Sequence, residues 1–221
     1  MRTYTHPDVL TKGVREGWAD PETNPANIDW AGRQARALVP YKVVEGRPRK
    51  PGAPTGIERG RNELGRWGEQ AAADAIVTVW RDGVRYLLMI VRGDGYGGAV
   101  PGGCVEPDED PVHAAFRECM EETCLDLTDV LASGAWRALP ARVVDDPRAS
   151  DEAWMSTLPV LIDLGPLPPG APFPAVAGAD DAKHAAWVRA DSYAVLAESL
   201  RDTFGERVFA AHEEMLAELL G

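Results

Sequence analysis

Residues 102–125, GGCVEPDEDPVHAAFRECMEETCL, carry most of the chemical information in this chain. Asp110 stands directly before Pro111, and these residue types are favoured at a helix N-cap and at the first helical position. The alternation of apolar and charged residues that follows has a helical period. We therefore predict a helix over residues 110–124.

The two faces of this helix differ in chemistry. At about 100° per residue, one face is predicted to be apolar: Val112, Ala115, Phe116, Cys119 and Thr123. The opposite face is predicted to carry Ala114, Arg117, Glu118, Glu121 and Glu122. Three carboxylates spaced by three or four residues can converge, and each close pair then costs about 4 kcal/mol at an effective dielectric of 20. A hard divalent cation such as Mg²⁺ removes that cost, whereas the alternative interpretation is a solvated acidic face.

The longer spacing favours the metal site. Gly103 is followed after five residues by Glu109, and after seven more by Arg117 and the sequence that runs to Leu125. This pattern resembles the Nudix box: Gly, five residues, Glu, seven residues, then Arg-Glu-apolar-any-Glu-Glu-any-Gly-apolar. Cys124 departs from the pattern, because the family usually has glycine there, a residue suited to a helix C-terminus.

The resemblance implies roles for the residues of the box. Glu118 and Glu122, assisted by Glu121, would bind Mg²⁺ or Mn²⁺, and the carbonyl of Gly102 would be a further ligand. Arg117 would pair with Glu109 and fix the geometry of loop and helix. Bound metal would lower the pKa of a coordinated water and stabilise the charge that develops on a pyrophosphate.

Four further segments extend the resemblance over most of the chain: EGRPRKP (45–51), GRWG with AAADAIVTVW (65–68, 71–80), VVDDPRASDEAW (143–154) and AGADDAKHAAWV (177–188). They are similar to the mitochondrial-type ADP-ribose pyrophosphatases and to the related ADP-ribose-sensing domain of cation channels. This group implies an enzyme, a nucleotide-binding hydrolase that cleaves the pyrophosphate of ADP-ribose to give AMP and ribose 5-phosphate.

The group also implies candidate residues for substrate binding. Arg148 would contact phosphate and Asp146 ribose hydroxyls. Asp74 stands at the position that aligns with the group. Asp181 is a candidate for a ribose contact or a general base. Trp67 could stack on a nucleobase, as could Tyr96 or Trp154. These three aromatic residues are more commonly found in a core. Where the relatives have Pro-Asn-His, this chain has Glu69-Gln70-Ala71, so a histidine near the nucleoside is missing.

Two points stay open at this stage. The residue that activates water could be Glu121, or a loop acid among Asp151, Glu152, Asp180 and Asp181. The substrate could instead be NAD, an NAD-derived biosynthetic intermediate or a nucleotide sugar. A protein of another class, a non-catalytic ADP-ribose sensor, would bind without turnover and usually lacks box carboxylates.

Composition limits the class of protein. The 221 residues include 45% hydrophobic residues and carry a net charge of −12. This negative net charge argues against binding nucleic acid or an anionic membrane through bulk charge. The N-terminus lacks an apolar segment typical of a signal peptide. We expect a soluble, cytoplasmic monomer or homodimer that acts on a small nucleoside diphosphate.

The remaining pattern predicts an α+β Nudix fold, in which a mixed β-sheet lies between helices. Residues 1–66, which include a short strand at 40–44, are expected to form a small lobe wrapping the core, and residues 67–221 the Nudix domain. The expected strands are 75–80 and 84–92 as a hairpin, then 141–146, 153–164 and 184–190. Helices interrupted near Gly205 are expected within residues 192–220.

Overall fold

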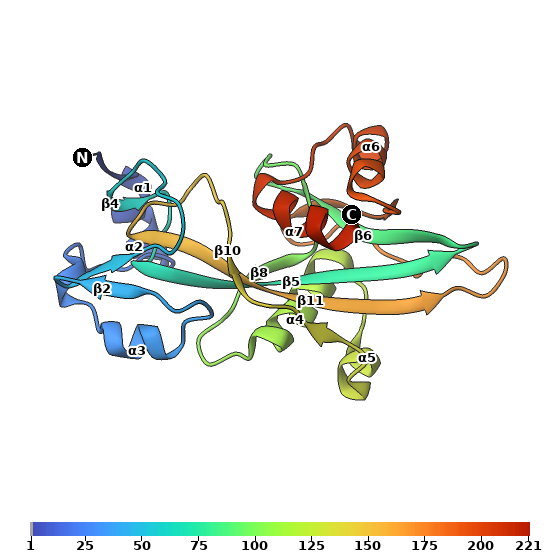
Figure 1. Ribbon diagram of the computed structural model, residues 1–221, viewed down its shortest axis with the longest axis horizontal. Coiled ribbons are helices and arrows are strands. Elements are labelled where there is room, and N and C mark those ends of the chain that lie inside the picture. The colour runs from blue at the N-terminus through green and yellow to red at the C-terminus, as the bar shows by residue number, and fades with distance from the viewer. Residues whose placement is uncertain (1) are drawn as a thin grey trace. The chain divides into compact units, whose positions relative to one another are not determined.

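The computed structural model describes residues 2–221, which form two compact units (Figure 1). The first unit runs to Ala71 and also includes Ala141–Thr157, and the second comprises Ala72–Pro140 and Leu158–Gly221. The expected boundary after residue 66 did not include the second segment of the first unit. That segment belongs there because its side chains pack in it: the rings of Trp154 and Tyr41 meet edge to face at 5.1 Å.

The first unit is built from short elements. It contains β1 (Thr3–Thr5), α1 (Pro7–Leu10), α2 (Lys12–Glu16), η1 (Pro25–Asn27), α3 (Trp30–Ala35), β2 (Lys42–Val44), β3 (Arg47–Arg49), β4 (Arg59–Asn62) and β10 (Arg142–Val143). Strand β1 pairs in parallel with β4, and β2 pairs antiparallel with β3. The helices have at most six residues, which is too short to give a periodic signal in the sequence.

The remaining strands and helices include the longest elements of the chain. They are β5 (Gly68–Arg81), β6 (Val84–Arg92), β7 (Gly98–Ala99), β8 (Gly102–Cys104), α4 (Pro111–Thr123), α5 (Thr128–Ser133), β9 (Arg137–Ala138), β11 (Ala153–Pro166), β12 (Ala182–Arg189), α6 (Tyr193–Phe204) and α7 (Ala210–Leu220). The path through the main sheet is β10-β11-β5-β6-β12. Asp82 and Gly83 both have positive φ, 51° and 77°, which is the conformation that a tight turn between β5 and β6 requires.

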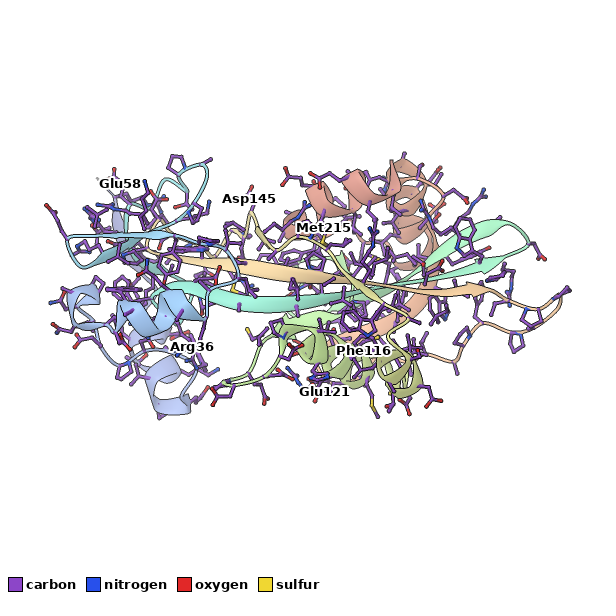
Figure 2. All side chains as sticks on the ribbon, turned by 60° about the horizontal axis from the view of Figure 1, so that its bottom comes forward. Arg36, Glu58, Phe116, Glu121, Asp145 and Met215 are labelled. Carbon is purple, nitrogen blue, oxygen red and sulfur yellow. The ribbon has the colours of Figure 1, made fainter. Side chains whose placement is uncertain are left out.

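Helices cover both faces of the sheet in the second unit. One apolar cluster joins alternate residues of β5 (Ala73, Ala75 and Val77) to α4. The residue between the last two, Ile76, belongs to a second cluster that includes α6 and α7. Met215 and Phe116 accordingly lie on opposite sides of the sheet in Figure 2. The expected α+β architecture, a mixed sheet between helices, is confirmed.

Two details concern the helices. Ala114 was expected on the polar face of α4 but is fully buried in the core, because the sheet covers a wider arc of the helix than the apolar stripe alone indicates. No helix within residues 2–221 has both the length and the apolar character needed to cross a membrane.

Candidate active site

Helix α4 begins and ends as local chemistry requires. The Oδ1 atom of Asp110 accepts hydrogen bonds from the backbone N–H groups of Val112 (2.9 Å) and His113 (3.3 Å), and Pro111 occupies the first turn. The helix ends at Cys124, whose φ of 58° is left-handed. The predicted helix is therefore confirmed, and it holds the box glutamates at fixed positions.

Arg117 organises the carboxylates around it. Its Nε and Nη2 atoms donate to the two oxygens of Glu109 at 2.8 and 2.9 Å, as the resemblance implied. Its Nη1 atom donates to Glu118 at 2.9 Å and to Glu121 at 2.8 Å. Hydrogen bonds to the guanidinium lower the pKa of Glu109. The guanidinium of Arg117 thus links the loop before α4 to two carboxylates of the helix.

The adjacent glycines bring the β8 backbone against these carboxylates. A Cβ atom on Gly103 would meet the carboxylate of Glu118, and that end of the flexible side chain would have to move away. The N–H of Gly102 donates to Oε2 of Glu122 at 2.8 Å. A Cβ atom on Gly102 would meet the backbone of Ala73 and Asp74 on β5, so the glycine at this position allows the close packing of β8 on its partner strand.

Glu122 is the most perturbed carboxyl group of the site. Its residue is 2% exposed, and burial, together with the neighbouring carboxyl of Asp181, raises its pKa to about 9. Burial also raises the pKa of Glu118. Burial therefore disfavours the ionised forms of Glu122 and Glu118 unless a further positive charge binds beside them.

These residues suit a hard divalent cation. Among residues 2–221 no three carboxylate, imidazole or thiol side chains are grouped closely enough to form a ready-made metal cage. Mg²⁺, however, keeps several waters and commonly takes only one or two protein carboxylates. The buried carboxylate of Glu122, the nearby Glu118 and the β8 backbone supply oxygen donors of that kind. The donor chemistry fits Mg²⁺ or Mn²⁺, with a counter-charge that would offset the raised pKa values.

Asp74 has a partner that sequence reasoning missed. It lies opposite Gly102 in the β5–β8 register, and its Oδ1 atom is 3.4 Å from Nε2 of the buried His212 on α7. The Nδ1 atom of His212 is buried without a hydrogen-bond partner among the described residues. Nothing in the spacing of the sequence indicates this contact, because its two residues come from opposite ends of the second unit.

The other predicted substrate residues divide between the two units. Asp181 is exposed in the second unit, and the backbone N–H of Ala179 beside it donates to the carbonyl of Glu122 at 3.0 Å. Asp146 and Arg148 lie in the first unit as a bidentate ion pair, with the shorter distance 2.6 Å. Trp67, also in the first unit, is 4% exposed.

The other candidates for base stacking and for the general base lie in different environments. Trp154 is fully buried and Tyr96 is 41% exposed. Glu152 is fully buried and bound by two arginines, and Asp151 accepts from the backbone of Thr55 at 2.7 Å. The carboxylates of Asp151 and Glu152 are thus hydrogen-bonded within the first unit. Glu121, bonded to Arg117, and Asp181, beside Glu122, are both exposed.

Comparison with known proteins identifies the class. Residues 69–209 match the family model described as NUDIX domain, and that range includes the whole box. The chain therefore belongs to the Nudix hydrolase family.

Individual relatives refine this assignment. The chain is 30% identical over 174 residues to the mitochondrial ADP-ribose pyrophosphatase of Rattus norvegicus, a match that covers 63% of this chain and 49% of that protein. It is 32% identical over 191 residues to a transient receptor potential cation channel subfamily M member-like 2 of Nematostella vectensis, covering 71% of this chain and 12% of the channel. The chain thus spans about half, or much less, of the length of these curated relatives.

The chain is also similar to a solved structure. The bifunctional NMN adenylyltransferase/ADP ribose pyrophosphatase from Francisella tularensis is 28% identical with a TM-score of 0.51, covering 69% of this chain and 40% of that one. The same enzyme complexed with AMP and a manganese ion is 27% identical with a TM-score of 0.50, covering 69% of this chain and 42% of that one.

Proposed function

We propose that this chain is a Mg²⁺- or Mn²⁺-dependent pyrophosphatase that hydrolyses ADP-ribose to AMP and ribose 5-phosphate. The observation that carries the proposal is the buried Glu122 carboxyl, bonded to the Gly102 backbone and raised in pKa to about 9. A group so costly to ionise is a candidate for metal binding. The similarity to ADP-ribose pyrophosphatases supports the choice of substrate.

The residues of the box and Asp181 would have different roles in this reaction. Glu118 and Glu122, with Glu121 and the Gly102 carbonyl, would hold the cation, which supplies charge stabilisation on the pyrophosphate. Arg117, paired with Glu109, holds Glu118 and Glu121 in place. One water adds to one phosphorus, the bridging P–O bond breaks, and the proton of the water passes to an exposed carboxylate, Glu121 or Asp181.

The residues outside the box would bind the rest of the substrate. Arg148 would contact phosphate, oriented by Asp146, whose carboxylate already occupies the Nε/Nη2 edge of the guanidinium. Asp74 and Asp181 remain candidates for contacts to the ribose, and Trp67 for stacking on the nucleobase. We expect the protein to act in the cytoplasm, as a monomer or homodimer.

The test measures release of AMP from ADP-ribose by the full chain with Mg²⁺ or Mn²⁺. Glu122→Gln is expected to lower kcat by at least about 100-fold, a loss of the size seen when one electrostatic contact to a transition state is removed. Asp129→Asn, an exposed carboxylate on α5, should leave kcat unchanged. Absence of AMP release, or full activity of Glu122→Gln, would overturn the proposal.

One observation keeps other dinucleotides in the test. Glu69, at the position where the relatives have a different sequence, accepts hydrogen bonds from the backbone N–H groups of Leu38 (2.7 Å) and Val39 (2.9 Å). Its carboxylate is thus committed to the first unit, and Ala71, which stands where the relatives have the histidine, offers no polar group to a nucleoside. Values of kcat/KM for ADP-ribose, NAD and a nucleotide sugar will rank the substrates, and tight binding without turnover would instead indicate a sensor.

A further inference from the structure

A cavity of about 410 Å³ is lined only by residues of the first unit. None of the box carboxylates belongs to its lining. Its volume is within the range of small-molecule sites. The lining contains three arginines, Arg47, Arg59 and Arg61, and no acidic residue. In a chain of net charge −12, a cavity lined only by positive charge needs a specific explanation.

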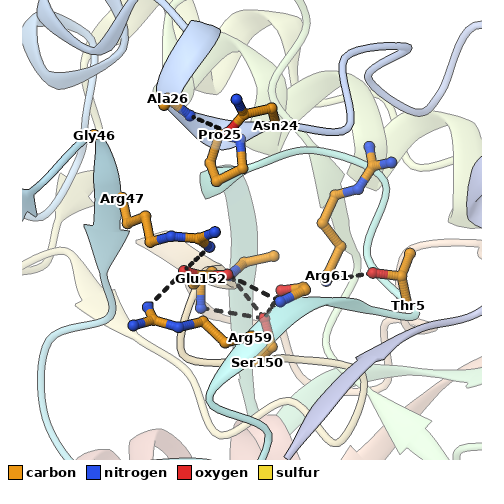
Figure 3. A network of polar contacts seen from close by, with 12 residues as sticks. Thr5, Asn24, Pro25, Ala26, Gly46, Arg47, Arg59, Arg61, Ser150 and Glu152 are labelled. Carbon is orange, nitrogen blue, oxygen red and sulfur yellow. Dashed lines mark hydrogen bonds and ion pairs between the residues drawn. The ribbon is translucent and has the colours of Figure 1, made fainter.

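Glu152 neutralises only part of this charge. Its Oε1 atom accepts from Nη1 of Arg47 at 2.8 Å and from Nη1 of Arg59 at 2.9 Å, and its Oε2 atom accepts from the N–H of Gly60 (Figure 3). The carboxylate is fully buried, whereas the side chains of Arg47 and Arg59 are 36% and 22% exposed. Two guanidinium groups therefore share one carboxylate and keep N–H donors available for a ligand.

Arg61 adds a third charge that has no carboxylate as a hydrogen-bond partner. It is fully buried, and its Nη1 atom donates only to the backbone carbonyls of Asp20 (2.8 Å) and Gly65 (2.6 Å). In Figure 3 its guanidinium extends away from Glu152. Burial lowers its pKa. The nearby Asp20 carboxylate is paired with Arg33, so the three arginines of the cavity face Glu152 with an excess of two positive charges.

The free edge of Arg61 has a specific shape. The Nε and Nη2 atoms of Arg117 and of Arg148 each bind one carboxylate in a fork. The same two atoms of Arg61 are buried without a hydrogen-bond partner among residues 2–221. Such a fork matches the oxygens of a carboxylate or a phosphate, but here it lies beneath the cavity wall, so its charge acts on a ligand without direct contact.

The remaining wall has two further kinds of contact. Thr5 accepts a hydrogen bond from the N–H of Arg61 at 2.9 Å, which leaves its hydroxyl proton to donate to a ligand. Trp67, Pro25 and Leu10 provide apolar surface. A small molecule with one doubly charged oxyanion and one apolar ring face suits this combination.

We propose that this cavity is a second binding site, for a small organic molecule that carries a phosphate monoester. Such a group carries between 1.5 and 2 negative charges at about pH 7, which matches the excess positive charge better than a single carboxylate does. Arg47 and Arg59 bind the phosphate at the accessible side, and Arg61 stabilises it from behind the wall.

The test is a calorimetric titration of the full chain in EDTA with inorganic phosphate, AMP and ribose 5-phosphate as separate probes. We expect saturable binding of one molecule per chain, and the three probes distinguish phosphate alone from recognition of a base or sugar. Arg47→Gln should raise Kd by about tenfold or more, since Glu152 keeps Arg59 and Gly60 as partners. Because neither metal nor turnover is involved, the result is independent of the proposed hydrolysis.

Matched variants decide the outcome. Arg49→Gln removes the same charge from the same strand, outside the cavity lining, and should leave Kd unchanged. Glu152→Gln removes the one carboxylate and should lower Kd. Absence of binding by all three probes, an equal loss in Arg49→Gln, or loss of binding in Glu122→Gln, which would place the ligand at the box, would each overturn the proposal.

Discussion

At the scale of single residues, Cys124 shows what the box glycine contributes. Its φ of 58° and ψ of 15° lie in the left-handed region, where a side chain costs about 1–2 kcal/mol and glycine costs nothing. The backbone has kept the conformation that glycine favours at the end of a helix, although the side chain has changed. The departure from the box therefore affects stability rather than a metal ligand.

We predict that Cys124→Gly raises the free energy of unfolding by about 0.5–1 kcal/mol, after the greater freedom of glycine in the unfolded chain is subtracted. Urea unfolding measures this change. Cys124→Ala removes the thiol but keeps the Cβ atom, so it should give no comparable gain. An equal gain in both variants would show that the thiol, and not the backbone conformation, is the source.

The residues that could be predicted from the sequence are those whose contacts are local. Arg117 and Glu109 are eight residues apart, and the spacing of the box contains both. His212 could not be predicted, because only the packing of α7 brings it to Asp74. The same holds for Arg61, which sits in a segment without periodicity and whose buried fork depends on the fold of the whole first unit.

At the scale of elements, α4 was predictable in its bounds because its cap and its period agree. The hairpin of β5 and β6 was predictable for the same reason, since Asp82 and Gly83 mark the turn. The start of β5 was expected at residue 75 but lies at Gly68, because EQAAA lacks the β-branched residues that indicate a strand. Strand β10 is shorter than expected, Arg142–Val143 rather than 141–146, because Asp145 and Asp146 belong to the turn that positions Arg148.

The packing of α4 against β8 also predicts a pH dependence. The pKa of Glu122 is about 9 in the folded chain and about 4.3 in an unfolded one. Between these values the folded state binds the additional proton, so metal-free protein loses stability as the pH rises. We predict that the Tm in EDTA falls across this window and that Glu122→Gln removes this component.

Mg²⁺ should act in the opposite direction. The cation binds the ionised carboxylate, so it competes with the proton and stabilises the folded state more at about pH 8 than at about pH 5.5. Thermal melts with and without Mg²⁺ at the two pH values measure the difference. Asp129→Asn should behave as the unchanged protein, whereas an undiminished pH slope in Glu122→Gln would contradict the assignment.

At the scale of the whole molecule, the first unit is discontinuous in sequence. Residues 141–157 belong to it together with the N-terminal residues, and a sequence boundary after residue 66 separates groups that pack together. Composition indicated where the irregular N-terminal region ends, but not which later segment completes it. Only the three-dimensional contacts of Glu152 and Trp154 establish that relation.

A chain shortened to residues 67–221 is therefore predicted not to fold cooperatively. It would leave Glu152 without Arg47 and Arg59, and a buried charge that loses its partners costs about 3–5 kcal/mol. It would also uncover Trp154, which is fully buried and packs on Tyr41. Thermal melts followed by circular dichroism test this. The Tm of Glu152→Gln in the full chain measures the loss of the Glu152 ion pairs alone, without the loss of Trp154 packing. A cooperative transition of the shortened chain at the Tm of the full chain would show that residues 67–221 are a self-sufficient domain, and that the first unit contributes to ligand binding rather than to folding.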